Sequence, residues 1–139
     1  MNACELAKRF GPPAGRILLA LLFVIAGYGK IGGFSGTAAY MASQGLPMSE
    51  VLLVVTIAIE LGGGLMIMLG WKARWAALAI FLFIIPTTLM FHQFWMADAA
   101  QAQNQMNHFL KNLAIMGGML YIVAHGPGPF SLDRERARS

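Results

Sequence analysis

Four long apolar runs dominate this chain, and they constrain its fold more than any other feature. They occupy about residues 15–33, 51–70, 75–96 and 107–125. A helix of about 20 residues, rising about 1.5 Å per residue, matches the thickness of a bilayer's hydrocarbon core, about 30 Å. We therefore predict an all-α integral membrane protein, in which a single domain of four transmembrane helices packs as a bundle.

The overall composition agrees with the apolar runs. Of the 139 residues, 58% are hydrophobic and 12% are charged, whereas soluble domains average about 45–50% and about 25%. A domain of this size has too small an interior to hide so much apolar surface from water. The composition excludes a soluble monomer and predicts that much of the surface contacts the lipid bilayer.

The basic residues indicate the orientation of the chain in the membrane. The net charge is +4, and eight of the ten Lys and Arg lie near the termini or between the second and third runs, at positions 8, 9, 16, 72, 74, 134, 136 and 138. This distribution is typical of membrane topology signals and not of a basic groove that binds nucleic acid. We predict a multi-pass membrane protein with both termini in the cytoplasm, including a charged cytoplasmic tail at 131–139.

Turn-forming and capping residues predict where the helices begin and end. Pro12 and Pro13 favour a first helix that begins at Ala14 or Gly15, because proline disrupts a helix interior. The other predictions are a loop over 34–49 with a short helix at 37–43, an N-cap at Ser49 followed by Glu50 in the first turn, and a polar connection over 98–106.

Glu60 is the polar residue that hydrophobicity explains least. A carboxylate in the middle of a span has an insertion cost of several kcal/mol and usually faces a partner or a cavity. Its helical neighbours include Thr56, Gly63 and Gly64, a small face that predicts an inward orientation. From the helical rise, Lys30 lies about 9 Å from Glu60 along the membrane normal, a gap that two long side chains nearly close. We predict an ion pair, which serves either function or only helix register.

A second polar group is predicted at the outer end of the bundle. It combines aromatic, amide and basic side chains from the end of the third run and the start of the fourth with Lys30 of the first. The members are Lys30, His92, Trp95, Asn107, His108, Lys111 and Asn112. An interfacial belt of amphipathic side chains explains the same residues. No metal site is predicted, because no ligand spacing such as HExxH occurs and Glu60 lies one or two turns deeper than His92 or His108.

Several short motifs, taken in order, resemble the DoxX family of small four-helix bacterial membrane proteins. The matching pieces are Gly15-Arg16, Gly29-Lys30, Glu60-Leu61-Gly62-Gly63, Arg74, Phe91-His92-Gln93-Phe94-Trp95, Asn107, Phe109-Leu110-Lys111-Asn112-Leu113, Gly117-Gly118, Gly126-Pro127-Gly128 and Ser131-Leu132-Asp133. The resemblance implies an inner-membrane protein related to oxidoreductase systems, including a thiosulfate:quinone oxidoreductase. The positions it carries over are Lys30, Glu60, His92, Lys111 and Asn112.

Three functional hypotheses follow. In the first, the chain is a membrane subunit that handles a quinone or a similar lipophilic substrate. Glu60 and His92 relay protons, and the substrate is bound by Lys30, Trp95, Asn107, Lys111 and Asn112. Electrons then come from a bound flavin or haem or from a soluble oxidoreductase partner. The alternatives are a non-catalytic anchor for a soluble redox or stress enzyme, and a small transporter that acts as a homodimer.

Overall fold

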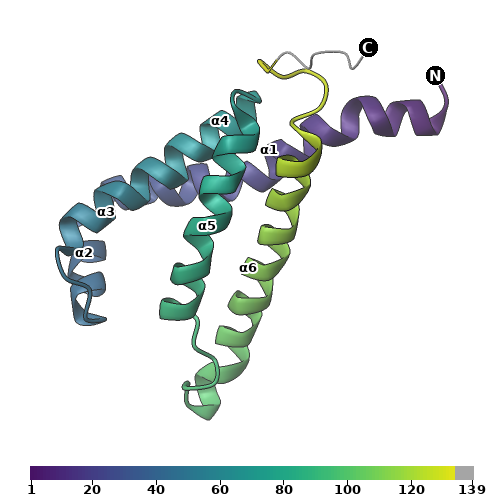
Figure 1. The fold of residues 1–139 in the computed structure, drawn as a ribbon. Coiled ribbons are helices and arrows are strands. Elements are labelled where there is room, and N and C mark those ends of the chain that lie inside the picture. The colour runs from purple at the N-terminus through teal and green to yellow at the C-terminus, as the bar shows by residue number, and fades with distance from the viewer. Residues whose placement is uncertain (134–139) are drawn as a thin grey trace.

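The computed structural model describes residues 1–133, and every regular element in that range is a helix (Figure 1). In chain order these are α1 (Ala3–Gly32), α2 (Phe34–Ser43), α3 (Ser49–Ile57), the π-helix η1 (Ala58–Gly62), α4 (Gly63–Leu69), α5 (Ala73–Phe91) and α6 (Ala99–His125). Because α3, η1 and α4 follow one another without a break, they form one rod, Ser49–Leu69. The all-α prediction is confirmed.

Three helices are long and apolar enough to cross a membrane: Ala3–Gly32, Ser49–Leu69 and Ala73–Phe91. Large apolar side chains project from them into the surroundings, including Leu18, Leu22, Ile25, Val54 and Leu82. Exposure of such side chains along whole helices is expected where the surrounding medium is lipid. α6 has 27 residues, but its first half carries Gln101, Gln103, Gln105 and Lys111 and is less apolar.

The prediction that the first helix begins at Ala14 or Gly15 is wrong, because α1 begins at Ala3 and continues through Pro12 and Pro13. A capping box starts the helix: the Glu5 backbone N–H donates to Asn2 Oδ1 and the Asn2 backbone N–H donates to Glu5 Oε2, both at 2.9 Å. This cap satisfies two of the free donors at the helix start. The φ of proline is compatible with a helix, and buried packing of Pro13 offsets the lost backbone bonds.

Other helix ends also differ from the sequence-based expectations. Asp98 accepts a bond from the Gln101 backbone N–H at 3.0 Å and caps α6, so most of the segment predicted as a polar connection is helical. The short helix predicted at 37–43 begins earlier, at Phe34. Met48, at φ 49°, and not Ser49 is the N-cap residue of α3. α5 ends at Phe91, which places His92 just beyond the helix.

The helices form two antiparallel pairs that meet at one end of the molecule and diverge at the other (Figure 1). α1 packs along α4 and η1, α5 packs along α6, and α4 joins the pairs by packing on α5. Glycines permit the close approach within the first pair: a Cβ on Gly27 would lie 2.8 Å from the Leu61 backbone nitrogen. α6 makes a smaller contact with α1, which includes Leu19 and Gly118.

The segment after α6, residues 126–133, closes the end where the pairs meet, and we name it the strap. Arg16, only 4% exposed, donates hydrogen bonds to the carbonyls of Pro127 (2.8 Å) and Pro129 (2.9 Å), and to that of Phe130. Its Nε also donates to the Met68 carbonyl in α4, at 3.3 Å. One guanidinium thus joins α1, the rod and the strap.

Asp133 ties the strap to the start of α5. Its carboxylate accepts hydrogen bonds from the backbone N–H groups of Lys72 (2.7 Å) and Ala73 (2.9 Å), the role that an N-cap side chain usually has. The charged tail predicted at 131–139 is therefore corrected at its start, since 131–133 pack against the turn that follows α4. Residues 134–139 lie outside the described range.

We expect Arg16→Leu to lower the free energy of unfolding by at least about 3 kcal/mol, because it leaves strap and rod carbonyls without donors. Thermal unfolding of the detergent-solubilised protein measures the loss. Arg9→Leu is the matched control. Arg9 is exposed and lies over the rings of Phe10 and Phe130, contacts that stabilise by about 0.5–1 kcal/mol at exposed sites. Equal effects of the two substitutions would contradict the role of Arg16.

Candidate functional site

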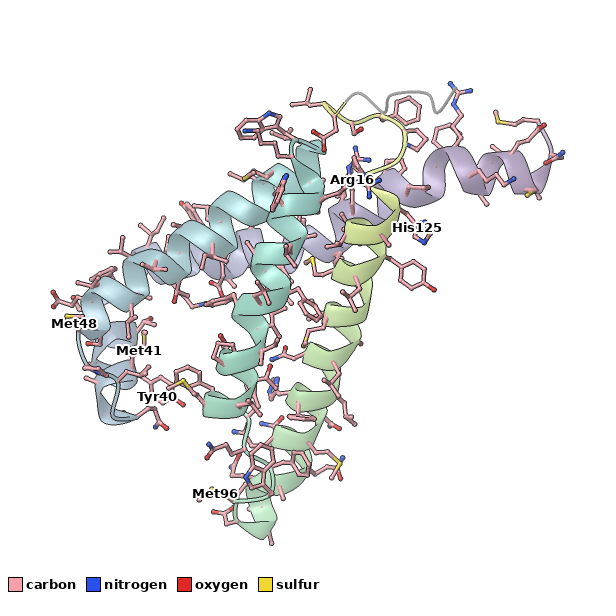
Figure 2. The ribbon with its side chains drawn as sticks, viewed as in Figure 1. Arg16, Tyr40, Met41, Met48, Met96 and His125 are labelled. Atoms are coloured by element: carbon pink, nitrogen blue, oxygen red, sulfur yellow. The ribbon has the colours of Figure 1, made fainter. Side chains whose placement is uncertain are left out.

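A cavity of about 220 Å³ lies between the two helix pairs, towards the end where they diverge. Its polar lining consists of Lys30, Thr37, Thr56, Glu60, Thr87 and His92, and its remaining walls are Tyr40, Met41, Phe83 and Phe91. Figure 2 shows Tyr40 and Met41 of α2 on the side of that helix that faces α5. The cavity therefore combines ionisable groups with aromatic rings, and α1, α2, the rod and α5 all contribute to it.

An ion pair between Lys30 and Glu60 forms the most polar part of the wall. Lys30 Nζ lies 2.8 Å from Glu60 Oε2. The Glu60 residue is 7% exposed, whereas Lys30 is half-buried and reaches it from the last turn of α1. The pairing predicted from the helical rise is confirmed. Because removing one partner would leave a charge in a low-dielectric site, each residue depends on the other.

Glu60 lies in the π-helical turn η1, which the sequence analysis did not anticipate. A π-turn inserts one extra residue into a helix and rotates the residues after it by about 100°. Gly63 can then face Ile80 of α5, and Gly64 can face Val24 of α1, while Glu60 still points inward. π-turns are frequent at functional sites. The sequence signal for an unusual turn here was Glu60, which stands two residues before the triplet Gly62, Gly63 and Gly64.

His92 lines the cavity from the C-cap position of α5. Its ring stacks on that of His108 in α6, with centroids 5.0 Å apart and planes inclined by 18°. Nδ1 lies 3.0 Å from Gln105 Oε1, and with that oxygen as acceptor the proton is on Nδ1. The second nitrogen, Nε2, is then free to accept a proton or a hydrogen bond.

Tyr40 and Phe91 connect α2 to α5 beside the ion pair. Their rings stack with centroids 5.8 Å apart, although the two helix backbones do not pack directly on one another. The contact is therefore made by side chains alone. Both residues line the cavity, and neither was among the predicted site residues, because an aromatic residue in an apolar helix carries no distinguishing signal.

The other predicted site residues do not line the cavity. Asn112 donates to Thr88 Oγ1 at 2.9 Å and holds α6 against α5. Asn107 is exposed and accepts a bond from Gln103 Nε2, and Lys111 is also exposed. Trp95 is exposed and packs edge-on against Phe94 and Phe109. The structure therefore brings Lys30, Glu60 and His92 together and places the remaining four on α6 or in the connection before it.

The apolar helices and the cavity between them define a class of protein, a helical membrane protein with a small, partly charged cavity. The DoxX family profile matches residues 11–93, a range that includes the whole cavity. The chain belongs to the DoxX family, which confirms the resemblance noted in the sequence.

Relatives of known location support the same class. The chain is 40% identical to inner membrane protein YqjF of Escherichia coli over 89% of its own length and 90% of that protein. It is 37% identical to the E. coli inner membrane protein YphA, with 86% of each chain covered. A surfeit locus protein 4 homolog of Schizosaccharomyces pombe is 26% identical, and the match covers 36% of that protein. No solved structure matches at a significant level. The protein is a multi-pass bacterial inner-membrane protein.

A charge-swap series tests the ion pair. We expect Lys30→Glu and Glu60→Lys each to reduce the yield of folded protein, because each single change places two like charges together. The double swap should recover most of the yield, with a coupling energy of about 1–3 kcal/mol in thermal unfolding. Glu50→Lys is the control, since Glu50 is exposed in the first turn of the same rod. A double swap no better than the worse single change would contradict the pairing.

Proposed function

We propose that this protein is a membrane subunit of an oxidoreductase system that binds the headgroup of a quinone or a similar lipophilic carbonyl compound. The observation that carries the proposal is the Lys30–Glu60 pair in the wall of an aromatic cavity. A cavity of about 220 Å³ is smaller than the sites of drug-sized ligands, which span about 300–1,000 Å³. It suits a single ring, with the lipophilic chain left between the helices.

The wall supplies the groups that a quinone ring requires. Lys30 is a hydrogen-bond donor to a ring oxygen, and Glu60 holds its ammonium in place. Phe83, Phe91 and Tyr40 offer aromatic faces. Trp95, Asn107, Lys111 and Asn112 are not part of this proposed headgroup site, because none of them lines the cavity.

Reduction of a quinone to a quinol consumes two electrons and two protons. In the proposal His92 and Glu60 are the proton-transfer residues, with His92 receiving protons at Nε2 from the side of His108. The electrons come from a soluble oxidoreductase partner. The chain's own part is to bind the headgroup, to orient it and to hold protons beside its oxygens.

We further propose that α6 is a fourth membrane crossing and that both termini are cytoplasmic. α6 packs antiparallel along α5, which is itself a candidate span, and it returns the chain to the end where the strap meets α1. Lys8, Arg9, Lys72 and Arg74 all belong to that end, whereas Lys30 belongs to the opposite end. An excess of basic residues indicates the cytoplasmic side.

Reporter fusions test this topology. An alkaline phosphatase fused after Asp98, beyond three crossings, should be active outside the membrane. The same reporter fused after Ser139 should be inactive, and a fluorescent protein at that position should fluoresce. Equal phosphatase activity from the two fusions would show that α6 does not cross.

Ligand retention tests the headgroup site. Protein purified with a short-chain benzoquinone analogue should retain about one molecule per chain, measured by mass spectrometry. Glu60→Gln and His92→Ala should each weaken retention at least tenfold, the effect of losing about 1.4 kcal/mol of binding free energy. Glu50→Gln is the control and should bind like the wild type. Equal retention by Glu60→Gln and Glu50→Gln would contradict the proposal. Capture of a soluble partner that is insensitive to Glu60→Gln would instead support an anchor.

A further inference from the structure

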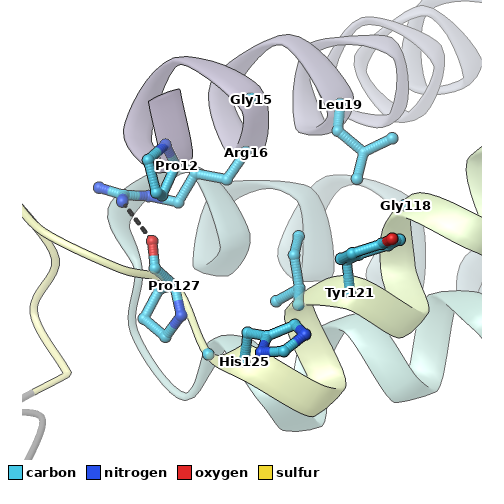
Figure 3. A pocket seen from close by; sticks show the side chains of 10 residues that line it. Pro12, Gly15, Arg16, Leu19, Gly118, Tyr121, His125 and Pro127 are labelled. Atoms are coloured by element: carbon cyan, nitrogen blue, oxygen red, sulfur yellow. Dashed lines mark hydrogen bonds between the residues drawn. The ribbon is translucent and has the colours of Figure 1, made fainter. Parts of the chain in front are cut away.

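A second, larger cavity of about 480 Å³ lies at the strap end of the molecule (Figure 3). It forms a groove between the first half of α1 and the last turns of α6. Pro12, Gly15 and Leu19 line one side, and Gly118, Ile122 and His125 line the other. The proposed quinone site uses none of these residues.

The groove exists because α1 and α6 touch at one level and separate beside it. A Cβ on Gly118 would lie 3.1 Å from the Leu19 side chain, so the helices are in close contact there. A Cβ on Gly15, one turn earlier on α1, would meet no atom within 4 Å. The Arg16 side chain turns towards the strap carbonyls, as the dashed bond to Pro127 shows in Figure 3, and so it does not fill the space.

The lining of the groove is mostly apolar, and its basic residues, Arg16 and His125, lie at the end near the strap. Its lining contains no acidic side chain. Lys8 is exposed on the same face of α1, one turn before Pro12, and His125 is exposed at the end of α6. The nearest acid on α1, Glu5, is held by the Asn2 backbone N–H in the capping box. An occupant must therefore combine an apolar body with a negative charge at one end.

Phospholipids have this combination, and one wall of the groove belongs to a helix long and apolar enough to cross the membrane. α1 is a candidate membrane span, and Tyr121 on the groove wall is exposed. Basic pockets between transmembrane helices are recurrent sites for anionic lipid headgroups. We propose that the groove binds one phospholipid with an anionic headgroup. An acyl chain lies along Gly15 and Gly118, and the phosphate lies between Lys8 and His125.

Two glycines on the same helix provide a matched test. Gly15→Leu places a side chain in the groove, whereas Gly11→Leu adds the same side chain to an exposed position outside it; neither Cβ would meet an atom within 4 Å. The probe is phosphatidylglycerol, with phosphatidylethanolamine as the zwitterionic competitor. Every variant is placed in nanodiscs that contain the two lipids in the same proportions. Native mass spectrometry counts the lipids retained after release from the nanodisc.

The wild type and Gly11→Leu should retain one phosphatidylglycerol per chain, and Gly15→Leu should retain at least fivefold less. The double variant Lys8→Gln, His125→Gln should retain both lipids equally. Wild-type retention by Gly15→Leu would overturn the groove as the site. Equal retention of the two lipids by the wild type would overturn the anionic headgroup. Binding of the quinone analogue by Gly15→Leu, measured in parallel, keeps this result separate from the proposed quinone site.

Discussion

The hydrogen bonds from Arg16 to backbone carbonyls are the interaction on which the rest of the structure depends. Arg16 is a buried donor for the carbonyls of Pro127, Pro129 and Phe130, and the bond to Pro127 is itself buried, where an unpaired carbonyl is costly. A guanidinium suits this role because its fork of donors serves several acceptors at once and keeps its charge. Arg74 acts similarly at the end of α6, where it donates to the carbonyls of Val123 and Ala124.

Closure at the strap end has a consequence at the opposite end. Because α1, the rod, α5 and the strap are joined near Arg16 and Asp133, the two helix pairs are free to diverge away from that point. The diverging helices leave a space that α2 covers from one side, and the Lys30–Glu60 cavity occupies it. A charge pair is tolerated there because each partner satisfies the other and Lys30 retains part of its exposure.

The parts of the structure that follow from local sequence were predictable. Apolar runs specify the helical class, and the helical rise places Lys30 within reach of Glu60. Arg16 was interpreted as a topology signal and as part of a family motif, and its hydrogen bonds were not predicted. Its acceptors are backbone carbonyls more than 50 residues away along the chain, and carbonyls have no sequence pattern. The π-turn at Glu60 was missed for a related reason, because the residues that pack against it on α1 and α5 are distant in sequence. The helix through Pro12 and Pro13 was missed because the prolines were interpreted as a helix start, whereas the local capping box of Asn2 and Glu5 starts it earlier.

Family motifs lie at both ends of the molecule, and they make different kinds of contact at each end. Gly15-Arg16, Arg74, Gly126-Pro127-Gly128 and Asp133 converge on the strap end, where they satisfy backbone groups and hold helix ends together. Lys30, Glu60 and His92 converge on the cavity, where their side chains face open space. Groups whose hydrogen bonds are all made within the protein have nothing left to offer a ligand. His92 Nε2 and the remaining donors of Lys30 are therefore the polar groups available to the proposed quinone headgroup, at the end of the molecule where the helices diverge.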